Sequence, residues 1–231
     1  MCGRYASARS VQDLASWFEA EEPEQALAPR WNVAPTDPVY AVVERQGSRQ
    51  LRVLRWGLVP SWSKDAKGAA RMINARVETV DGKPAFRAAY QRRRCLLPAD
   101  GYYEWQVDGP RKQPFYLSAR DGSPLAMAGL YEVWSRPGAD GADTAERLWT
   151  CTVITTSAAD EHGAIHDRTP LLVLPQDWSR WLDPSREDPG RDLLVPGTPG
   201  VLDAWPVSPA VGNVRNDGPG LVEPLAAASS G

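Results

Sequence analysis

The chain has 231 residues, of which 42% are hydrophobic and 24% are charged, and this composition excludes a disordered or fibrous protein. Its 26 basic and 29 acidic residues give a formal net charge of −3, which excludes a uniformly basic nucleic-acid coat but leaves room for a local basic groove. No apolar run has the length of a membrane span, and the N-terminus has no signal-type stretch. We therefore expect a cytoplasmic protein without a membrane partner.

The first predicted element is a short amphipathic helix over Ser10–Ala20, with Ser10 as its N-cap and Asp13 three positions further on. Pro23 and Pro29 end this helix. The segment RWNVAPT that follows is expected to be an extended loop.

The central part of the chain has the pattern of β-strands. A hairpin is expected from strands over Val39–Glu44 and Leu51–Trp56, joined by a turn at Gln46-Gly47-Ser48. After the polar segment SKDAKGAA, a predicted surface loop, more β-like runs follow between Asp, Gly and Pro turns: Arg94–Leu97, Tyr102–Val107, Phe115–Ser118, Leu125–Val133 and Leu148–Thr155. The segment GADGADT is expected to form the tip of a hairpin.

Helical patterns return at Gln176–Leu182 and Asp188–Leu194, and the end EPLAAASSG is small and polar. The sequence has no internal repeat and no long linker. We therefore expect residues 1–225 to form a single α+β domain, with a mainly antiparallel, curved or barrel-like sheet and a few peripheral helices. Residues 226–231 are expected to form a flexible C-terminal tail.

Tryptophan is unusually frequent, with 10 Trp against 3 Phe. Trp31, Trp56 and Trp62 lie among turn residues rather than in apolar runs. Tryptophan usually packs in or near a core, but aromatic side chains in polar loops also stack on the bases of single-stranded nucleic acid. The sequence leaves both interpretations open.

Cysteine usage is sparse. Cys2, Cys95 and Cys151 form no CxxC pair and cannot all pair with one another, so a disulfide-stapled secreted domain is not expected. These cysteines and the 2 histidines do not have the spacing of a zinc site. The sequence therefore predicts neither a metal nor another cofactor.

Cys2 has the most distinctive chemistry in the chain. Removal of the initiator methionine would expose an α-amine, of pKa roughly 7.7–8.0, beside a thiol of pKa ~8.5. The amine can condense with an aldehyde to an imine, and the sulfur can then close on the imine carbon to give a five-membered thiazolidine. The alternative is an incidental cysteine at a frayed terminus.

Other polar residues could assist such chemistry. Glu104 lies among aromatic residues in DGYYEWQ, where burial would raise its carboxyl pKa and suit it to acid–base catalysis, although an exposed strand position is the alternative. His162 and His166 share a polar loop and could exchange protons near neutral pH, but a solvated loop position describes His162 better. The amide of Asn74 could orient a substrate hydroxyl.

Basic residues cluster locally despite the negative total. Guanidinium groups bind phosphates and stack on bases, and several lie in the same half as the loop tryptophans: Arg4, Arg71, Arg76, Arg87 and Arg92–Arg94. A run of charges is more often a solvated face, which is the default expectation for Arg92–Arg94.

Several segments, taken together and in order, resemble the SRAP family: MCGRY, RWNVAPT, RWGLVPSW, NARVET, RRCLLPADGYYEW, HDRTP and AVGNV. The resemblance extends from Cys2 to about residue 224. It implies a DNA-damage (SOS) response protein that shields abasic sites in single-stranded DNA by a covalent crosslink through its processed N-terminal cysteine. It also implies a fold shared with that family.

The resemblance implies a role for each matching residue. Cys2 is the nucleophile and the site of the thiazolidine, and Asn74 holds the opened deoxyribose. Glu104 handles protons at the α-amine and in reversal of the crosslink, while His166 assists the opening of the sugar ring to its aldehyde.

The resemblance also implies a DNA-binding surface. Arg4, Arg76 and Arg168 match positions that contact DNA phosphates, and Trp62 and Trp105 match aromatic positions that line the DNA channel. Ser63 stands where the family often has a second aromatic residue, so the stacking at that edge differs.

The expected partner is therefore single-stranded DNA with abasic sites, bound by a monomer in the cytoplasm, associated with the nucleoid in a bacterium; replication partners stay unknown. AP-lyase activity by β-elimination and peptidase-like self-processing are also expected. One alternative is an N-terminal-nucleophile cysteine peptidase or amidase, in which Cys2 attacks an amide. The other is a non-covalent single-strand binding module.

Overall fold

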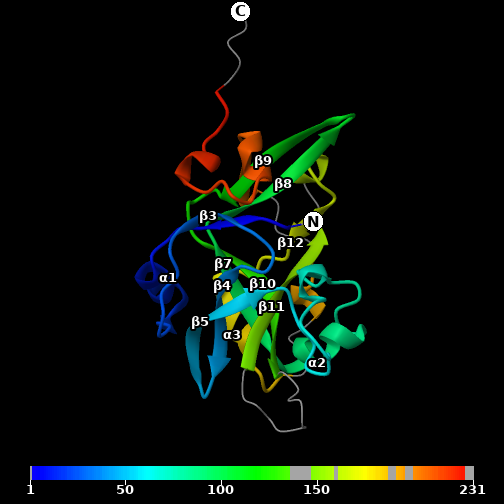
Figure 1. The fold of residues 1–231 in the computed structure, drawn as a ribbon. Coiled ribbons are helices and arrows are strands. Elements are labelled where there is room, and N and C mark those ends of the chain that lie inside the picture. The colour runs from blue at the N-terminus through cyan, green and yellow to red at the C-terminus, as the bar shows by residue number, and fades with distance from the viewer. Residues whose placement is uncertain (1, 136–146, 159–160, 187–190, 196–199, 227–231) are drawn as a thin grey trace, which may run out of the picture.

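The computed structural model describes residues 2–135, 147–158, 161–186, 191–195 and 200–226. Strands in these ranges form two sheets, with the five-stranded sheet above the larger one in Figure 1. The five-stranded sheet has the order β13 (Leu202–Pro206), β9 (Arg111–Ala119), β8 (Gly101–Asp108), β1 (Tyr5–Ser7) and β3 (Arg30–Val33).

The larger sheet closes into a barrel. The strands of the barrel wall are β11 (Arg147–Ser157), β10 (Leu125–Ser135), β7 (Arg94–Ala99), β4 (Pro38–Arg45) and β5 (Ser48–Trp56). Strand β11 pairs antiparallel with β10 on one side and parallel with β5 on the other, which closes the ring. Shorter strands extend it: β2 (Ala20–Glu21), β6 (Asn74–Arg76) and β12 (Arg168–Pro170). The predicted α+β class with a barrel-like, mainly antiparallel core is confirmed.

The two faces of the barrel wall pack into different clusters because side chains alternate along each strand. The interior cluster includes Val39, Ala41, Val43, Leu54, Trp56, Cys95, Leu97, Met127, Cys151 and Val153. The outer face is covered by the three α-helices of the described chain, α1 (Val11–Phe18), α2 (Pro84–Arg92) and α3 (Trp178–Leu182). Figure 1 shows α1 and α2 on opposite sides of the barrel.

Helix α1 follows the predicted pattern. The Ser10 hydroxyl oxygen accepts the backbone N–H of Asp13 at 3.1 Å, and the apolar face is buried. The helix ends at Glu19, whose backbone is left-handed with φ of 51°.

The predicted hairpin is also confirmed as β4 and β5, which pair in register from Pro38↔Arg55 to Arg45↔Ser48. The turn itself is Gln46-Gly47, because Ser48 already belongs to β5. Both turn residues have positive φ, 54° and 84°, as a tight two-residue hairpin requires.

Two expectations about local structure were wrong. RWNVAPT is not only loop, because Arg30–Val33 form β3, which pairs with β1 at the sheet edge. Arg94 is not a solvated charge: it is 2% exposed and donates to backbone carbonyls at the ends of α2 and α3, those of Tyr90, Gln91, Trp181, Asp183 and Arg186. The carbonyls left unpaired at helix ends give this buried cation its partners.

Short 3-10 turns complete the described structure: η1 (Ala69–Arg71), η2 (Glu161–Ala164), η3 (Pro175–Asp177), η4 (Arg191–Leu193), η5 (Pro209–Gly212) and η6 (Pro219–Leu221). The helix predicted over Gln176–Leu182 is present as η3 followed by α3. Of the helix predicted over Asp188–Leu194, the described part holds only η4. GADGADT and the end of the predicted tail lie outside the described residues.

Candidate functional site

Cys2 is held inside the fold rather than at a frayed end. Its side chain is 0% exposed and packs with the interior cluster of the barrel, where Tyr5 joins it. Strand β1 follows directly and pairs with β8 on one side and β3 on the other, while the Tyr103 N–H donates to the Arg4 carbonyl at 2.9 Å. The expectation of a frayed terminus at Cys2 is therefore wrong.

Asn74 contacts this terminus directly. It begins β6, which pairs in parallel with β11 at Val153↔Asn74, and its Nδ2 donates to the carbonyl oxygen of Cys2 at 2.8 Å. Its Oδ1 is buried and accepts no hydrogen bond from the described residues. Asn74 thus holds the Cys2 backbone with one end of its amide and leaves an acceptor at the other end.

The thiol of Cys2 is protonated in this environment. Burial raises its pKa well above the ordinary value, and the negative charge of Glu104 adds to this increase, while the Arg4 backbone N–H opposes it. This corrects the expectation of a thiol with a pKa near 8.5. A reactive sulfur at this position needs a base to remove its proton.

Glu104 is a candidate for the base that removes this proton. It lies on β8, is 3% exposed, and pairs in register with Phe115 of the neighbouring strand β9. Burial raises the pKa of Glu104 to about 7. Its carboxyl group therefore exchanges protons near neutral pH, and the exposed alternative for this residue is wrong.

The loop that carries His166 crosses the same face of β8. Side chains on one face of a strand are two residues apart, so Tyr102, Glu104 and Gln106 point the same way. The Tyr102 hydroxyl contacts that of Thr169 at 2.9 Å, and Gln106 Nε2 donates to the Ala164 carbonyl at 3.0 Å. The segment between these two contacts, which includes His166, therefore runs opposite Glu104.

His166 is held at one ring nitrogen. Nδ1 accepts the backbone N–H of Arg168 at 2.9 Å, and the carboxylate of Asp167 lies 2.9 Å from the same atom. Burial lowers the pKa of His166, so the neutral ring is favoured at pH 7. His162, within η2, is 7% exposed, so the expectation of a solvated histidine was wrong.

The predicted DNA-contacting aromatics differ in exposure. Trp62 is 68% exposed in the loop after β5, and Trp105 is half-buried on β8 beside the cluster of Tyr103 and Tyr116. Trp56, by contrast, is fully buried in the barrel and its Nε1 donates to a backbone carbonyl. Of these tryptophans, Trp62 has the largest face available to stack on a base.

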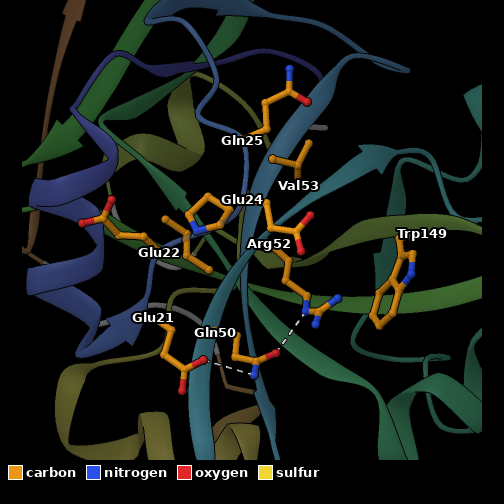
Figure 2. A pocket seen from close by; sticks show the side chains of 10 residues that line it. Glu21, Glu22, Glu24, Gln25, Gln50, Arg52, Val53 and Trp149 are labelled. Carbon is orange, nitrogen blue, oxygen red and sulfur yellow. Dashed lines mark hydrogen bonds between the residues drawn. The ribbon is translucent and has the colours of Figure 1, made fainter.

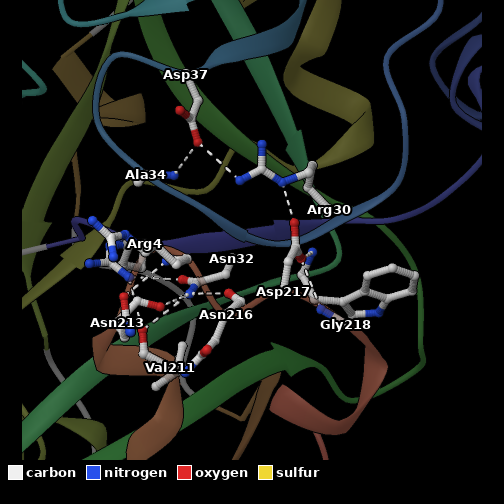
Figure 3. Close-up of polar contacts among 12 residues, drawn as sticks. Arg4, Arg30, Asn32, Ala34, Asp37, Val211, Asn213, Asn216, Asp217 and Gly218 are labelled. Carbon is white, nitrogen blue, oxygen red and sulfur yellow. Dashed lines mark hydrogen bonds and ion pairs between the residues drawn. The ribbon is translucent and has the colours of Figure 1, made fainter.

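Arg76 and Arg4 occupy different environments. Arg76 is exposed at the end of β6, two residues after Asn74. Figure 3 shows Arg4 among polar contacts of the protein itself: Nη1 donates at 2.9 Å to Asn32 Oδ1 and to the Val211 carbonyl. The buried amide of Asn32 donates to carbonyls of the same C-terminal segment, those of Val211, Asn213 and Asn216. Arg4 therefore has a structural role beside any DNA contact.

Arg168 is also bonded within the protein. Its Nη1 and Nη2 donate to the two carboxylate oxygens of Glu78 at 2.5 and 3.0 Å, and Nη2 donates to the Thr155 carbonyl at 2.7 Å. Reasoning from the sequence missed Glu78 and Asp167, although both lie inside segments, NARVET and HDRTP, that were singled out.

Another concavity lies away from these residues. A cavity of about 440 Å³ is lined by the acidic segment after β2 and by side chains of β5 and β11, among them Glu21, Glu24, Arg52 and Trp149 (Figure 2). None of the predicted site residues lines it.

The described ranges contain no group of three or more His, Cys, Asp and Glu residues placed to hold a metal ion. Among the helices in those ranges, none has the length and apolar character of a membrane span.

The sequence is similar to curated proteins over nearly its whole length. It is 36% identical over 228 residues to the abasic site processing protein YoqW of Bacillus subtilis, covering 96% of this chain and 99% of that one. It is 36% identical over 236 residues to the abasic site processing protein YedK of Escherichia coli, covering 97% and 100%. Identity to the abasic site processing protein HMCES of Gallus gallus is 32%, over 77% of this chain and 58% of that one.

The fold is similar to solved structures as well. A crystal structure of a protein from Bacteroides thetaiotaomicron superposes with a TM-score of 0.86 at 24% identity, covering 97% of this chain and all of that one. A phage-related protein from Bordetella bronchiseptica gives a TM-score of 0.69 at 28% identity. The family model for SOS response associated peptidase (SRAP) matches residues 1–214. The chain therefore belongs to the SRAP family.

Proposed function

We propose that this protein processes abasic sites by capturing them covalently in single-stranded DNA, after removal of Met1, through the amine and sulfur of Cys2. The observation that carries the proposal is the grouping of three side chains: the buried Cys2, the Asn74 amide bonded to its carbonyl, and the Glu104 carboxyl, whose charge acts on the Cys2 thiol. The names of the relatives, abasic site processing proteins, point to the same substrate.

The chemistry balances without a cofactor. The ring-opened deoxyribose of an abasic site is an aldehyde, and the free α-amine of Cys2 adds to its carbonyl carbon. Loss of one water gives the imine. The Cys2 sulfur then bonds to the imine carbon while its proton goes to the nitrogen, and the product is a thiazolidine.

Each neighbouring group has one task in this sequence. Glu104, with a pKa of about 7, takes the proton from the amine or thiol and returns it when water leaves. Asn74 Oδ1 accepts a hydrogen bond from a sugar hydroxyl, because it is buried and accepts none from the described protein residues. His166, neutral at pH 7, assists the opening of the sugar ring.

The DNA strand is expected to follow exposed groups near Cys2 and Asn74. Arg76 is exposed close to Asn74, and Trp62 offers an uncovered aromatic face to a base. Arg4, Arg168 and Trp105 line the proposed path with part of their surface. A monomer acting at the nucleoid is the simplest assembly for this task.

The test is a denaturing gel of the Met1-processed protein with an oligonucleotide that contains one abasic site. A heat-stable shifted band is expected for wild type and for Cys151→Ala, a matched change of another buried free cysteine. Cys2→Ala should give no band. A chain that retains Met1 should also give none, because its Cys2 nitrogen is an amide. A durable band from either of the last two proteins would overturn the proposal.

Cys2→Ser separates the steps of the mechanism. Its amine still forms an imine, which can break the strand by β-elimination, but its hydroxyl cannot form the sulfur ring. We expect scission and an intermediate, labile crosslink. A Cys2→Ser crosslink as durable as that of wild type would exclude the thiazolidine.

An N-terminal-nucleophile peptidase or amidase would use the same Cys2. It predicts turnover of an amide substrate and no DNA band. A non-covalent binding module predicts that Cys2→Ala leaves the tightest DNA complex unchanged. The gel and an amide-hydrolysis assay on the same preparation distinguish these functions from the proposed one.

A further inference from the structure

The ion pair of Arg168 and Glu78 joins two segments that are remote in sequence. Glu78 follows β6 by two residues, and Arg168 begins β12. Two hydrogen bonds, at 2.5 and 3.0 Å, connect the guanidinium to both carboxylate oxygens. The Arg168 side chain is 12% exposed, and the Glu78 side chain is 51% exposed. A planar guanidinium held at two points on a carboxylate has a fixed orientation.

The backbone of Arg168 in turn determines how His166 is held. The Arg168 N–H donates to His166 Nδ1 at 2.9 Å, and with this bond Nδ1 is the acceptor and Nε2 carries the hydrogen in the neutral ring. The exposed carboxylate of Asp167 lies 2.9 Å from the same Nδ1 and would favour hydrogen on Nδ1 once the Arg168 N–H moved away. The Arg168 side chain is held from a second direction, because Nη2 also donates to the Thr155 carbonyl of β11. Displacement of Arg168 would release Nδ1 and allow both tautomers.

We propose that Glu78 is a positioning residue for His166, acting through Arg168, so that its carboxylate sets the ring tautomer and orientation needed at the sugar. This inference rests on the proposed function, because it assigns His166 a task there. In this inference, two residues of one short segment hold two parts of the site. Asn74 of β6 holds the Cys2 backbone, and Glu78, in the turn after β6, holds the segment that carries His166.

The same contacts limit what Arg168 can do for DNA. Its guanidinium already serves a carboxylate and a carbonyl, so its main role is to hold the loop, and phosphate binding is secondary. Removal of the Glu78 charge should therefore not weaken binding of intact DNA. It should slow the reaction after binding.

The test compares Glu78→Gln with a matched control, Asp192→Asn. Asp192 forms the same kind of two-point pair with Arg180, at 2.5 and 2.8 Å, away from the candidate site. At saturating abasic DNA, the crosslinking rate of Glu78→Gln should fall about tenfold or more, since a small displacement of a reacting group has such effects. The control should match wild type. The affinity of Glu78→Gln for intact single strands, measured by fluorescence anisotropy, should be unchanged or higher.

A spectroscopic measurement keeps the inference independent of the reaction. Long-range ¹H–¹⁵N spectra of the imidazole should show the Nε2–H tautomer in wild type and in Asp192→Asn, and a mixture in Glu78→Gln. If wild type forms no crosslink, the proposed function fails, whereas this spectrum still tests the positioning role. An unchanged tautomer, or a saturating rate within twofold of wild type, would overturn the inference.

A second variant covers the case in which Glu78→Gln folds poorly. Arg168→Lys keeps the charge and the backbone N–H but loses the two-point pair. It should slow crosslinking at saturating DNA by a factor similar to that of Glu78→Gln. Because both changes break one pair, the double variant should be no more than about twofold slower than the slower single variant. Independent, multiplying effects would contradict a shared route.

Discussion

The carboxyl group of Glu104 is raised in pKa from 4.5 to about 7 because folding removes it from water. An acid whose folded pKa lies above its unfolded pKa binds its proton more tightly in the folded state. The resulting stability is present below pH 4.5 and is lost as the pH rises through about 7. The group to which we assign proton transfer at neutral pH therefore lowers the free energy of unfolding at that pH.

Replacement of Glu104 by Gln should remove this pH dependence. The amide has the shape of the protonated acid, so the variant should match wild type near pH 4 and exceed it by roughly 3 kcal/mol at pH 8. Urea unfolding at a series of pH values measures the difference. Glu24→Gln, at an exposed position, is the control. Parallel pH curves for Glu104→Gln and wild type would show that the carboxyl is not buried as described.

Asn74 allows a sharp comparison of two substitutions. Its Nδ2 donates to the Cys2 carbonyl at 2.8 Å. Asn74→Ala removes this bond, whereas Asn74→Asp keeps the shape but places a carboxylate oxygen against that carbonyl. We expect both to slow crosslinking, by about tenfold or more, with the Asp variant the slower of the two. Rates at saturating abasic DNA measure this; an Asp variant as fast as wild type would exclude the orienting role of the amide N–H.

Some residue-level properties were predictable because they depend on local sequence. The aromatic neighbours of Glu104 indicated its burial. The partners of Arg94 and Glu78 were not predictable, because they lie on segments far away in the chain. The low exposure of His162 likewise depends on packing that a polar loop sequence does not indicate.

At the level of elements, strands with clear alternation and turn residues were predicted close to their observed bounds, as β4, β5 and β8 show. The short strands β3 and β6 have too few residues to show alternation, and their pairing with β1 and β11 defines them. Helix α2 was missed although it had a signal: Pro84 at its start, then buried Phe86, Ala89 and Tyr90 at helical spacing.

Arg94 joins the ends of two helices, and its removal should destabilise both. Five carbonyl oxygens would lose a buried donor in Arg94→Ala, for which we expect a loss of about 3–5 kcal/mol in the free energy of unfolding. Arg94→Lys keeps the charge but has fewer donors, so it should lose less. Arg87→Ala, an exposed position on α2, is the control. Urea unfolding measures all three, and a loss below 1 kcal/mol in Arg94→Ala would contradict the described contacts.

At the scale of the whole molecule, the barrel and the five-stranded sheet meet around Cys2, and the C-terminal segment secures the outer side of that sheet. Asn32 holds this segment by three carbonyls, and Asp217 accepts the Trp31 N–H at 2.7 Å. Closure of the barrel depends on β5 and β11, which are remote in sequence. No local pattern could indicate this pairing, which is why the sequence predicted a curved sheet or barrel without its order.

The net charge of −3 requires DNA binding to depend on local cations rather than on the whole surface. Arg76 is exposed, whereas Arg4 donates to protein oxygens. Arg76→Ala should therefore reduce the magnitude of the negative slope of log affinity against log salt by about 0.7 for single strands, the value for one phosphate contact. It should leave the unfolding temperature unchanged. Arg4→Ala should lower the unfolding temperature, because the Asn32 and Val211 oxygens lose a donor. Anisotropy titrations over a range of salt and thermal unfolding of both variants measure these effects. The same salt slope in Arg76→Ala and wild type would exclude a phosphate contact at this position.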